Sequence, residues 1–253
     1  MKYKAGIALG GGGSRGFAHL GVLKALEEEN IKIDVISGTS AGSIVGTLLA
    51  DGKTSDEIFD IIKEIDFGDF MHLKVPKNGF ISLDDLREKM AAALSVHEFS
   101  KLKKPCYVTV ANLLTGEVQY LQEGNIPFAV QASSSIPVVF TPVTMHDQVY
   151  VDGGLIDNVP VRPLVGQCEK IIAVDVMPVH QLDAIDGILD IALRTFHMGG
   201  GSLTEEMKKE CTLHIQLDEL VKYHVFEIKK KKEIYDIGYE SAKKLDLSDL
   251  TKD

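Results

Sequence analysis

Four consecutive glycines, Gly10–Gly13, follow the short apolar run 5–9 and constrain the fold more than any other feature of the chain. Glycine loses more backbone freedom on folding than any other residue, so the run predicts a loop. The apolar run before it predicts a buried strand, and residues 15–30 after it predict a helix with apolar side chains at near-helical spacing. Backbone N–H groups at a helix start attract negative charge, so the loop is a candidate anion site.

The anion is either a dinucleotide pyrophosphate or a reaction oxyanion. Gly11, Gly13 and Gly16 satisfy GxGxxG, the pattern of a dinucleotide-binding loop. That function also needs an acid at the end of the next strand, whereas Asp34 precedes the apolar residues of that strand. Arg15 opposes the helix macrodipole by about 0.3–1 kcal/mol, so we expect something negative to offset it. A tight turn without a ligand is the structural alternative.

A second motif, Gly38-Thr39-Ser40-Ala41-Gly42, is a GxSxG sequence between a predicted strand, 34–37, and a predicted helix, 41–50. A serine in this position lies on a strained turn with its hydroxyl exposed above the start of the helix. The residues 12–16, GGSRG, match the same pattern and make Ser14 a rival nucleophile. We favour Ser40, because the glycine loop then remains for an oxyanion hole and one site needs both parts.

A candidate base is Asp152, which follows the apolar residues of a predicted hairpin, 143–151, and precedes Gly153 and Gly154. Strand ends are where the active sites of α/β sheets lie. The structural alternative is an Asp-Gly turn of the kind expected at Asp51 and Asp186. None of the eight histidines has the sequence context of a base, although His19 lies close to the glycine loop. No HExxH or HxxxH pair exists, so we expect no metal and no cofactor.

The remaining chain alternates between predicted strands and helices, which predicts an α/β fold with a mostly parallel sheet covered on both faces. Thr54 with Glu57 forms a capping box that opens a helix ending at 65, and Ser82 caps a helix ending at 94. Further strands are expected at 106–112, 117–121, 170–176 and 212–217, and further helices at 184–198 and 221–245. We expect one domain over 1–253, with its motifs within about 5–177 and a C-terminal helical segment at about 221–245.

Composition limits the partners. The net charge of −10 makes nucleic acid a poor partner. Three cysteines, odd in number and far apart, favour a reduced, cytoplasmic context, and the longest uncharged stretch, 35–50, is too short to cross a bilayer. Lys229–Lys232 lie in a predicted helix and indicate a solvated face, with a weak, transient contact to an anionic lipid surface as the alternative. No feature indicates an oligomeric state.

Taken in order, LGGGGSRGFAHLGVL, GTSAGS, QASSSIP and DGGLIDNVP resemble the motifs of patatin-like phospholipases, particularly the small bacterial members. The resemblance implies a three-layer α/β/α fold and lipid or carboxylic esters as substrates. It implies a dyad of Ser40 and Asp152 without histidine, and an oxyanion hole of Gly11, Gly12 and Gly13 that Arg15 supports. The motifs also contain Gly16, Gly38, Gly42, Gly153 and Gly154. A non-catalytic adaptor with the same fold and a nucleotide- or phosphate-binding protein are the alternatives.

Overall fold

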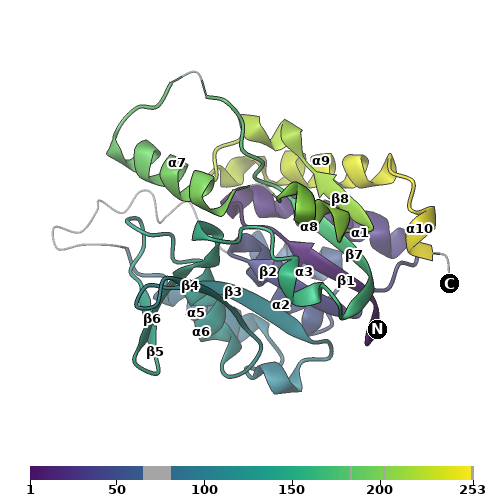
Figure 1. Ribbon diagram of the computed structural model, residues 1–253, viewed down its shortest axis with the longest axis horizontal. Helices are drawn as coiled ribbons and strands as arrows, with labels where there is room; N and C mark the ends of the chain where they lie inside the picture. Colours follow the sequence, from purple (N-terminus) through teal and green to yellow (C-terminus); the bar gives the residue numbers. More distant parts are fainter. Residues whose placement is uncertain (65–80, 183, 202, 252–253) are drawn as a thin grey trace.

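The computed structural model describes residues 1–64, 81–182, 184–201 and 203–251. Its centre is a sheet that contains eight strands in the described residues (Figure 1). Five neighbouring strands are parallel, in the order β3, β2, β1, β7, β8. These strands are β3 (Cys106–Asn112), β2 (Val35–Thr39), β1 (Tyr3–Leu9), β7 (Cys168–Asp175) and β8 (Leu213–Gln216).

Three antiparallel strands extend the sheet around β3. They are β4 (Glu117–Leu121), β5 (Val143–Met145) and β6 (Gln148–Asp152). Both β2 and β4 pair with Thr109, and both β4 and β6 pair with Val110. A strand has only two edges, so β4 occupies one edge of β3, while β2 and β6 share the other, one after the other.

The larger apolar core covers one face of the sheet. Alternate residues of a strand point to opposite faces, and Ile7 and Leu9 belong to this core, whereas Ala8 belongs to a smaller one. The helices on the larger core are α1 (Phe17–Glu28), α2 (Ala41–Ala50), α3 (Ser55–Ile62), α5 (Asp84–Ala93), α6 (Ile126–Ser133) and α9 (Lys231–Lys243).

Shorter elements cover the opposite face. Val159, Val161 and Leu164 pack against Ala8 and its neighbours, and Leu203 joins them from the segment before α8 (Glu205–Lys209). The helix α7 (Ile188–Gly200) packs on the short turn η3 (Gly153–Leu155) that follows β6, and α10 (Ser248–Thr251) closes the described chain (Figure 1). The α/β fold with a mostly parallel central sheet is therefore confirmed, with one outer layer thinner than the other.

The predicted elements agree with the structure except at several helix ends. The capping box of Thr54 and Glu57 is present, and α3 ends at Ile62, whereas the predicted end at 65 lies outside the described residues. The N-cap of α5 is Leu83 and not the predicted Ser82, although the Ser82 hydroxyl, one residue earlier, accepts a hydrogen bond from the N–H of Asp84 at 3.1 Å. The first helix opens with a 3₁₀ turn over Gly13–Gly16, and α7 begins four residues later than predicted, after Gly187.

The predicted helix 221–245 is wrong over its first ten residues. Two 3₁₀ turns, η5 (Asp218–Lys222) and η6 (Ile228–Lys230), precede α9, which begins at Lys231. The carbonyl oxygens of Tyr223 and Val225 accept hydrogen bonds from Arg15 and Ser14 instead of from a helical turn. Tyr, His, Val and Phe at 223–226 are weak helix formers, so tertiary contacts override the helical pattern here.

None of the helices in the described part of the chain combines the length and the apolar character needed to cross a membrane. Lys229–Lys232 lie partly in η6 and partly in the first turn of α9. Lys230 pairs with Glu233, Lys232 pairs with Asp236, and Lys231 donates to the carbonyl of Lys63. Three of the four lysines are therefore engaged in contacts within the molecule, while Lys229 is exposed.

Two glycines set the distance between α1 and α9. A Cβ added to Gly21 would lie 2.1 Å from the carbonyl oxygen of Tyr235, and one added to Gly238 would lie 2.1 Å from that of Ala18. Both contacts are far inside van der Waals distance and involve backbone, which cannot rotate away. The helices can cross this closely only because both positions lack a side chain.

We predict that Gly238→Ala lowers the free energy of unfolding by about 1–3 kcal/mol, because the methyl group forces the two helices apart. Helix propensity alone predicts the opposite, a gain of about 1 kcal/mol. Urea unfolding followed by circular dichroism measures the change, with Glu240→Ala on the exposed face of α9 as the control. A Gly238→Ala protein as stable as the wild type would contradict the close crossing.

Candidate active site

Ser40 is the residue at which β2 turns into α2. Its backbone has φ 51° and ψ −121°, a combination that costs a non-glycine residue about 1–3 kcal/mol. The carbonyl oxygen of Ser40 accepts hydrogen bonds from the N–H of Ser43 at 2.8 Å and from the Ser43 hydroxyl at 2.6 Å. A strained serine between a strand and a helix is the geometry of a nucleophile elbow.

The shared edge of β3 brings Asp152 next to this turn. Thr39 pairs with Thr109, and Asp152 pairs with Val110, the next residue of β3. Since Ser40 directly follows Thr39, the two predicted catalytic residues meet where β2 stops and β6 stops. Both line the same cavity.

Asp152 is only 1% exposed. Its Oδ1 accepts a hydrogen bond from the N–H of Gly154 at 2.8 Å, whereas its Oδ2 has no hydrogen-bond partner among the described residues. Burial raises the pKa of Asp152 to about 7, while the Gly154 bond and the Ser40 side chain lower it. The Ser40 hydroxyl thus adjoins the carboxylate without a hydrogen bond of ordinary geometry, and such catalytic bonds are often long before substrate binds.

The glycine loop approaches Ser40 from the end of β1. A Cβ at Gly11 would lie 3.2 Å from Cβ of Ser40 and 2.7 Å from Oδ1 of Asn158. The N–H of Gly11 donates to the carbonyl oxygen of Asn158 at 3.2 Å, so this group differs from the sequence prediction and is not a free oxyanion donor. The N–H groups of Gly12 and Gly13 donate to no described residue, which leaves two candidate donors.

Ser133, at the end of α6, connects the elbow to the sheet. The N–H of Ser40 donates to its hydroxyl oxygen at 2.9 Å, and the hydroxyl donates to the carbonyl oxygen of Thr109 at 2.7 Å. The hydroxyl therefore replaces the backbone pairing that is lost where the chain turns away from β3. The motif QASSSIP points to this segment, but three consecutive serines do not indicate which one makes the contact.

Asn158 ties the glycine loop to the segment after Asp152. It is buried, and its Nδ2 donates to the carbonyl oxygen of Gly11 at 3.4 Å while its own carbonyl accepts from the Gly11 N–H. The motif DGGLIDNVP contains Asn158, but the sequence does not indicate that this residue binds the glycine loop, because asparagine is also an ordinary turn residue.

The other motif glycines lie where backbone or side chains approach too closely for a Cβ. Gly42 shows the reason: a Cβ there would lie 2.0 Å from the carbonyl oxygen of Leu9, so α2 starts directly against the end of β1. An added Cβ would also come within 3.0 Å of another heavy atom at Gly16, Gly38, Gly153 and Gly154.

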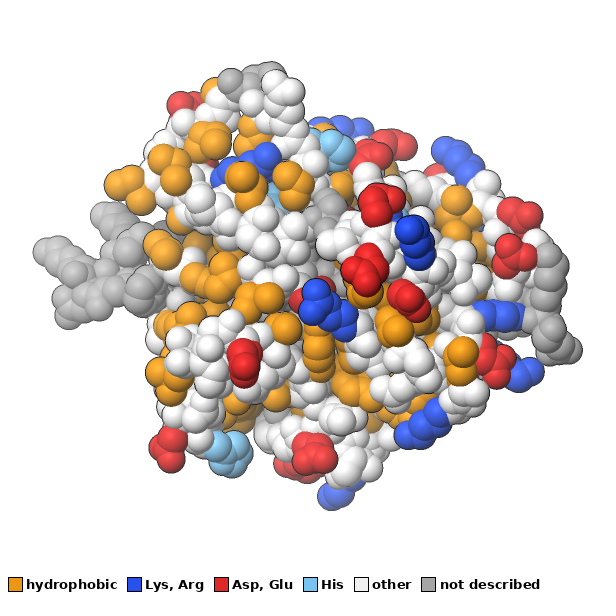
Figure 2. All heavy atoms as spheres, viewed as in Figure 1, with side chains coloured by type: hydrophobic (Ala, Val, Ile, Leu, Met, Phe, Trp, Pro, Cys, Tyr) orange, Lys and Arg blue, Asp and Glu red, His pale blue; other side chains and the backbone are white. Residues whose placement is uncertain are grey.

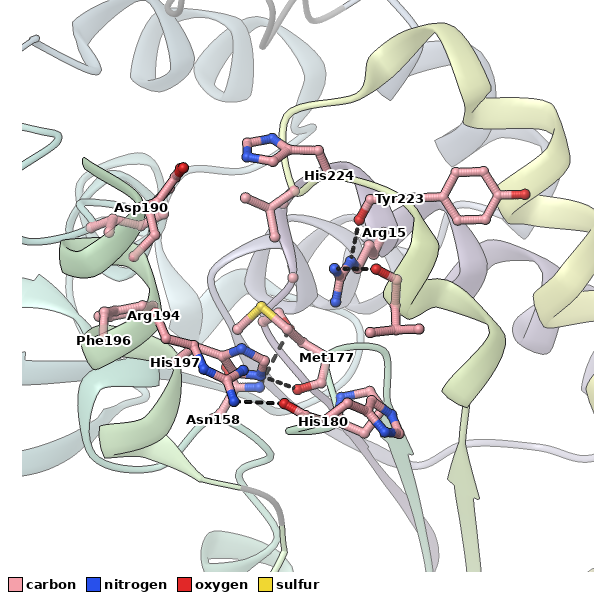
Figure 3. Close-up of a pocket in the computed structure, with 18 of the residues that line it drawn as sticks. Arg15, Asn158, Met177, His180, Asp190, Arg194, Phe196, His197, Tyr223 and His224 are labelled. Carbon is pink, nitrogen blue, oxygen red and sulfur yellow. Dashed lines mark hydrogen bonds between the residues drawn. The ribbon is translucent and has the colours of Figure 1, made fainter. Parts of the chain in front are cut away.

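Ser14 and Arg15 face the C-terminal part of the chain. The Ser14 hydroxyl donates to the carbonyl oxygen of His224 at 3.1 Å, and Ser14 is not among the described residues that line the cavity. Arg15 donates to the carbonyl oxygens of Tyr223 at 2.9 Å and Val221 at 3.4 Å (Figure 3). Burial lowers the pKa of Arg15 to about 10, and Asp175 raises it. The expected negative partner is therefore Asp175, together with these two carbonyl groups.

Histidines surround the site, but none of the described ones bonds with Ser40 or Asp152. His19 is fully buried, its Nε2 lies 2.7 Å from the carbonyl oxygen of Gly10, and burial lowers its pKa to about 4. It therefore supports the loop as a neutral side chain. His72 lies outside the described residues. Within the part of the chain that is described, no three His, Cys, Asp or Glu side chains are grouped to hold a metal ion.

Two cavities meet at Ser40. The larger, of about 390 Å³, also contains Asp152 and the glycine loop, with Arg194, His197 and His224 farther out (Figure 3). The smaller, of about 50 Å³, shares Gly13, Ser40, Ile136 and Val225 with it. Apart from Gly16 and Ser134, the rest of its lining is apolar: Phe17, Ala41, Ile44, Val45, Ile62, Leu83, Leu86, Phe140 and Phe226.

Comparison with known families agrees with this arrangement. The family model described as "Patatin-like phospholipase" matches residues 7–165. The chain belongs to the patatin-like phospholipase family. The match contains the glycine loop, the elbow and the segment around Asp152.

Relatives of this patatin-like chain are longer proteins. An uncharacterised NTE family protein of Mycobacterium tuberculosis is 30% identical over 166 residues, which cover 64% of this chain and 46% of that protein. Lysophospholipase NTE1 of Candida albicans is 26% identical over 269 residues, which cover 94% of this chain and 19% of that protein. This chain therefore spans less than half of the length of either relative.

The patatin-like fold is also present in a solved structure. VipD from Legionella pneumophila matches 96% of this chain and 66% of its own, with a TM-score of 0.53 and 16% sequence identity. At this identity the likeness concerns the fold alone.

The buried carboxyl group of this patatin-like site predicts a pH-dependent stability. Asp152 has a pKa of about 7 in the folded chain and about 3.9 when unfolded. Its charge therefore costs stability increasingly as the pH rises from about 4 to 7, and this cost is absent at lower pH. Asn keeps the acceptor for Gly154 and cannot ionise, so Asp152→Asn should be clearly more stable than wild type at about pH 8.5 and nearly equal at about pH 4.

Urea unfolding at the two pH values measures this difference. Asp186→Asn, which changes an exposed aspartate, is the matched control and should show little pH-dependent difference from wild type. A stability difference for Asp152→Asn that is the same at both pH values would mean that Asp152 ionises normally.

Proposed function

We propose that the chain is a serine-dependent lipid acyl hydrolase that cleaves carboxylic esters of phospholipids, lysophospholipids or related lipids. Membership of the patatin-like phospholipase family supports a lipid hydrolase, and the fungal relative is named a lysophospholipase. The observation that carries the proposal is the buried Oδ2 of Asp152, which has no hydrogen-bond partner among the described residues and lies beside the strained Ser40. A buried carboxylate oxygen without a partner is costly, and a base that must accept a proton needs such an oxygen.

In the first half of the reaction, Oγ of Ser40 attacks the ester carbonyl carbon while Asp152 accepts the hydroxyl proton. The carbonyl oxygen becomes an oxyanion that accepts hydrogen bonds from the N–H groups of Gly12 and Gly13. The intermediate collapses when the ester C–O bond breaks, and the leaving alcohol takes the proton from Asp152. The product is an acyl group on Ser40.

In the second half, a water molecule attacks the acyl carbon and Asp152 accepts its proton. The same two N–H groups hold the second oxyanion. The bond to Ser40 then breaks, the proton returns from Asp152 to Oγ, and the fatty acid leaves. Burial supports this role, because a carboxylate with a pKa of about 7 is a far better base than an exposed one.

The two cavities support a lipid ester as the substrate. The small cavity, of about 50 Å³, has room for only a short part of an acyl chain, and Phe17, Ile44 and Leu86 offer that part no polar contact. The larger cavity contains Arg194, His197 and Asp190 and suits the more polar alcohol part. Ser40 lies on the wall that the cavities share, where the ester bond between the two parts would be.

The alternatives are weaker. Asp34 accepts hydrogen bonds from the N–H groups of Lys4 and Ala5, at the start of β1, so it lies at the opposite end of the sheet from the glycine loop and cannot bind the ribose of a dinucleotide there. A non-catalytic adaptor has no use for a strained serine beside a buried base, and covalent labelling separates it from an enzyme.

All three cysteines are unpaired, which supports a cytoplasmic setting.

We predict that Ser40→Ala abolishes both ester hydrolysis and covalent labelling by a fluorophosphonate, whereas Ser14→Ala retains most of each. Ser14 donates its hydroxyl to His224 O and does not line the cavity with Asp152 in the described structure, so it cannot be activated by that base. Mass spectrometry of the labelled peptide and a panel of p-nitrophenyl and phospholipid esters provide the measurements. A label on the peptide that contains Ser14 would overturn the assignment.

We predict that Asp152→Asn lowers kcat by at least about 10²–10⁴-fold without unfolding the chain, because Asn cannot accept the Ser40 proton. In the wild type, kcat should rise with pH and reach half of its plateau near the pKa of about 7 of the base. Near-normal turnover of a folded Asp152→Asn protein would rule out the dyad. A pH profile that is flat through neutrality would rule out Asp152 as the titrating base.

A further inference from the structure

The helix α7 presents three large apolar side chains to solvent, although Phe196 on its inner side is buried. Ile188, Ile191 and Met198 are 84%, 52% and 58% exposed and lie at helical spacing along one stripe. Thr195 completes the stripe, but its hydroxyl donates to the carbonyl oxygen of Ile191 at 2.7 Å within the helix. The only hydroxyl proton of the described stripe is therefore used within the helix.

Two polar side chains of α7, Arg194 and His197, make hydrogen-bond contacts with the segment before the helix. Arg194 donates to the carbonyl oxygen of His180 at 2.6 Å, and Nε2 of His197 lies 2.5 Å from that of Met177 (Figure 3). At the end of the helix, a Cβ on Gly200 would lie 1.7 Å from the carbonyl oxygen of Gly154, so α7 packs tightly on the turn that follows Asp152. These contacts hold the helix in this orientation, so its apolar stripe faces solvent although the helix itself is firmly packed.

The loop before α7 continues the apolar surface to the mouth of the larger cavity. Leu182 and Ile185 are both exposed and both line this cavity. Apolar side chains gather over this part of the molecule in the space-filling view (Figure 2). We call Leu182, Ile185, Ile188, Ile191 and Met198 the apolar rim. A gathering of exposed apolar side chains of this kind is typical of an interaction surface.

The charges of this segment limit what can cover it. Residues 176–200 contain three aspartates, one arginine and no lysine, and Arg194 is already bonded to the His180 carbonyl. Asp186 and Asp190 are exposed near the rim, so an anionic surface is repelled there. A partner protein on the rim would also close the mouth of the cavity, whereas a lipid surface would deliver substrate through it.

We propose that the apolar rim docks the chain on lipid surfaces without net charge, such as phosphatidylcholine, and places the cavity mouth against the lipid. Figure 1 shows α7 standing at one end of the molecule, away from both termini. The docking is driven by burial of the rim and not by attraction of Lys229–Lys232 to anionic headgroups. The choice of a lipid as occupant rests on the function proposed above.

Vesicle sedimentation tests the docking separately from catalysis. The full chain carrying Ser40→Ala is mixed with vesicles of phosphatidylcholine, or of phosphatidylcholine and phosphatidylglycerol in equal parts. We expect binding to phosphatidylcholine, with no gain from phosphatidylglycerol. Adding Ile188→Ser and Ile191→Ser should weaken the partitioning about tenfold or more, since two large apolar side chains no longer enter the lipid.

A matched control is available on the turn after β3. Leu113 and Leu114 are also large, apolar and exposed, and Leu113→Ser with Leu114→Ser should leave the binding unchanged. In the background with Ser40 intact, the Ile188→Ser/Ile191→Ser protein should hydrolyse a soluble p-nitrophenyl ester at the wild-type rate. Its rate on phosphatidylcholine vesicles should fall in proportion to the lost binding.

Three results would overturn the docking. One is equal vesicle binding by the α7 variant and its parent. Another is binding that requires phosphatidylglycerol and disappears in salt, which would point to Lys229–Lys232. The third is a dimer, seen by analytical ultracentrifugation, that the α7 substitutions dissociate while no vesicle binds. If instead Ser40→Ala retained hydrolysis, the proposed function would fail while vesicle binding through the rim could still be observed.

Discussion

One edge of β3 serves two strands, and the candidate site depends on that arrangement. β2 runs parallel along this edge and ends at Thr39, and β6 runs antiparallel along it and ends at Asp152. The two strands run toward each other and stop beside consecutive residues of β3. Backbone hydrogen bonds of the sheet therefore fix the relative positions of Ser40 and Asp152, which gives the precision that a rigid scaffold provides and loops do not.

The neighbouring strand β1 brings the third part. Because β1 pairs with β2, its glycine loop emerges beside the elbow, and Asn158 connects that loop back to the segment after β6. The same packing removes water from Asp152, which raises its pKa. It leaves the N–H groups of Gly12 and Gly13 without a hydrogen-bond acceptor among the residues that the structure describes. Three features that lower stability occur together here: the strained backbone of Ser40, a desolvated carboxyl group and unused N–H donors. Such features are often found together at functional sites.

Local patterns are enough to predict the fold class and the elbow at Ser40, because each depends on a few adjacent residues. The role of Asp152 as the base is predicted only by the resemblance of the ordered motifs to a known family, since an Asp-Gly pair alone is also an ordinary turn. Gly11 shows the limit: its sequence context equals that of Gly12 and Gly13, and only the distant carbonyl of Asn158 makes its N–H unavailable. Ser133 is one of three serines, and only its contact with Thr109 distinguishes it. Residues 223–226 follow a helical pattern that their long-range contacts with Ser14 and Arg15 override.

Those contacts have a consequence for how the protein is made. The glycine loop leaves the ribosome roughly 200 residues before the carbonyl groups of Val221, Tyr223 and Val225 that hold Ser14 and Arg15. During translation the loop has no such support until these residues have emerged. Assembly of the candidate oxyanion loop is thereby delayed until the segment 221–225 is synthesised, so a chain truncated before this segment would lack the contacts that hold the loop.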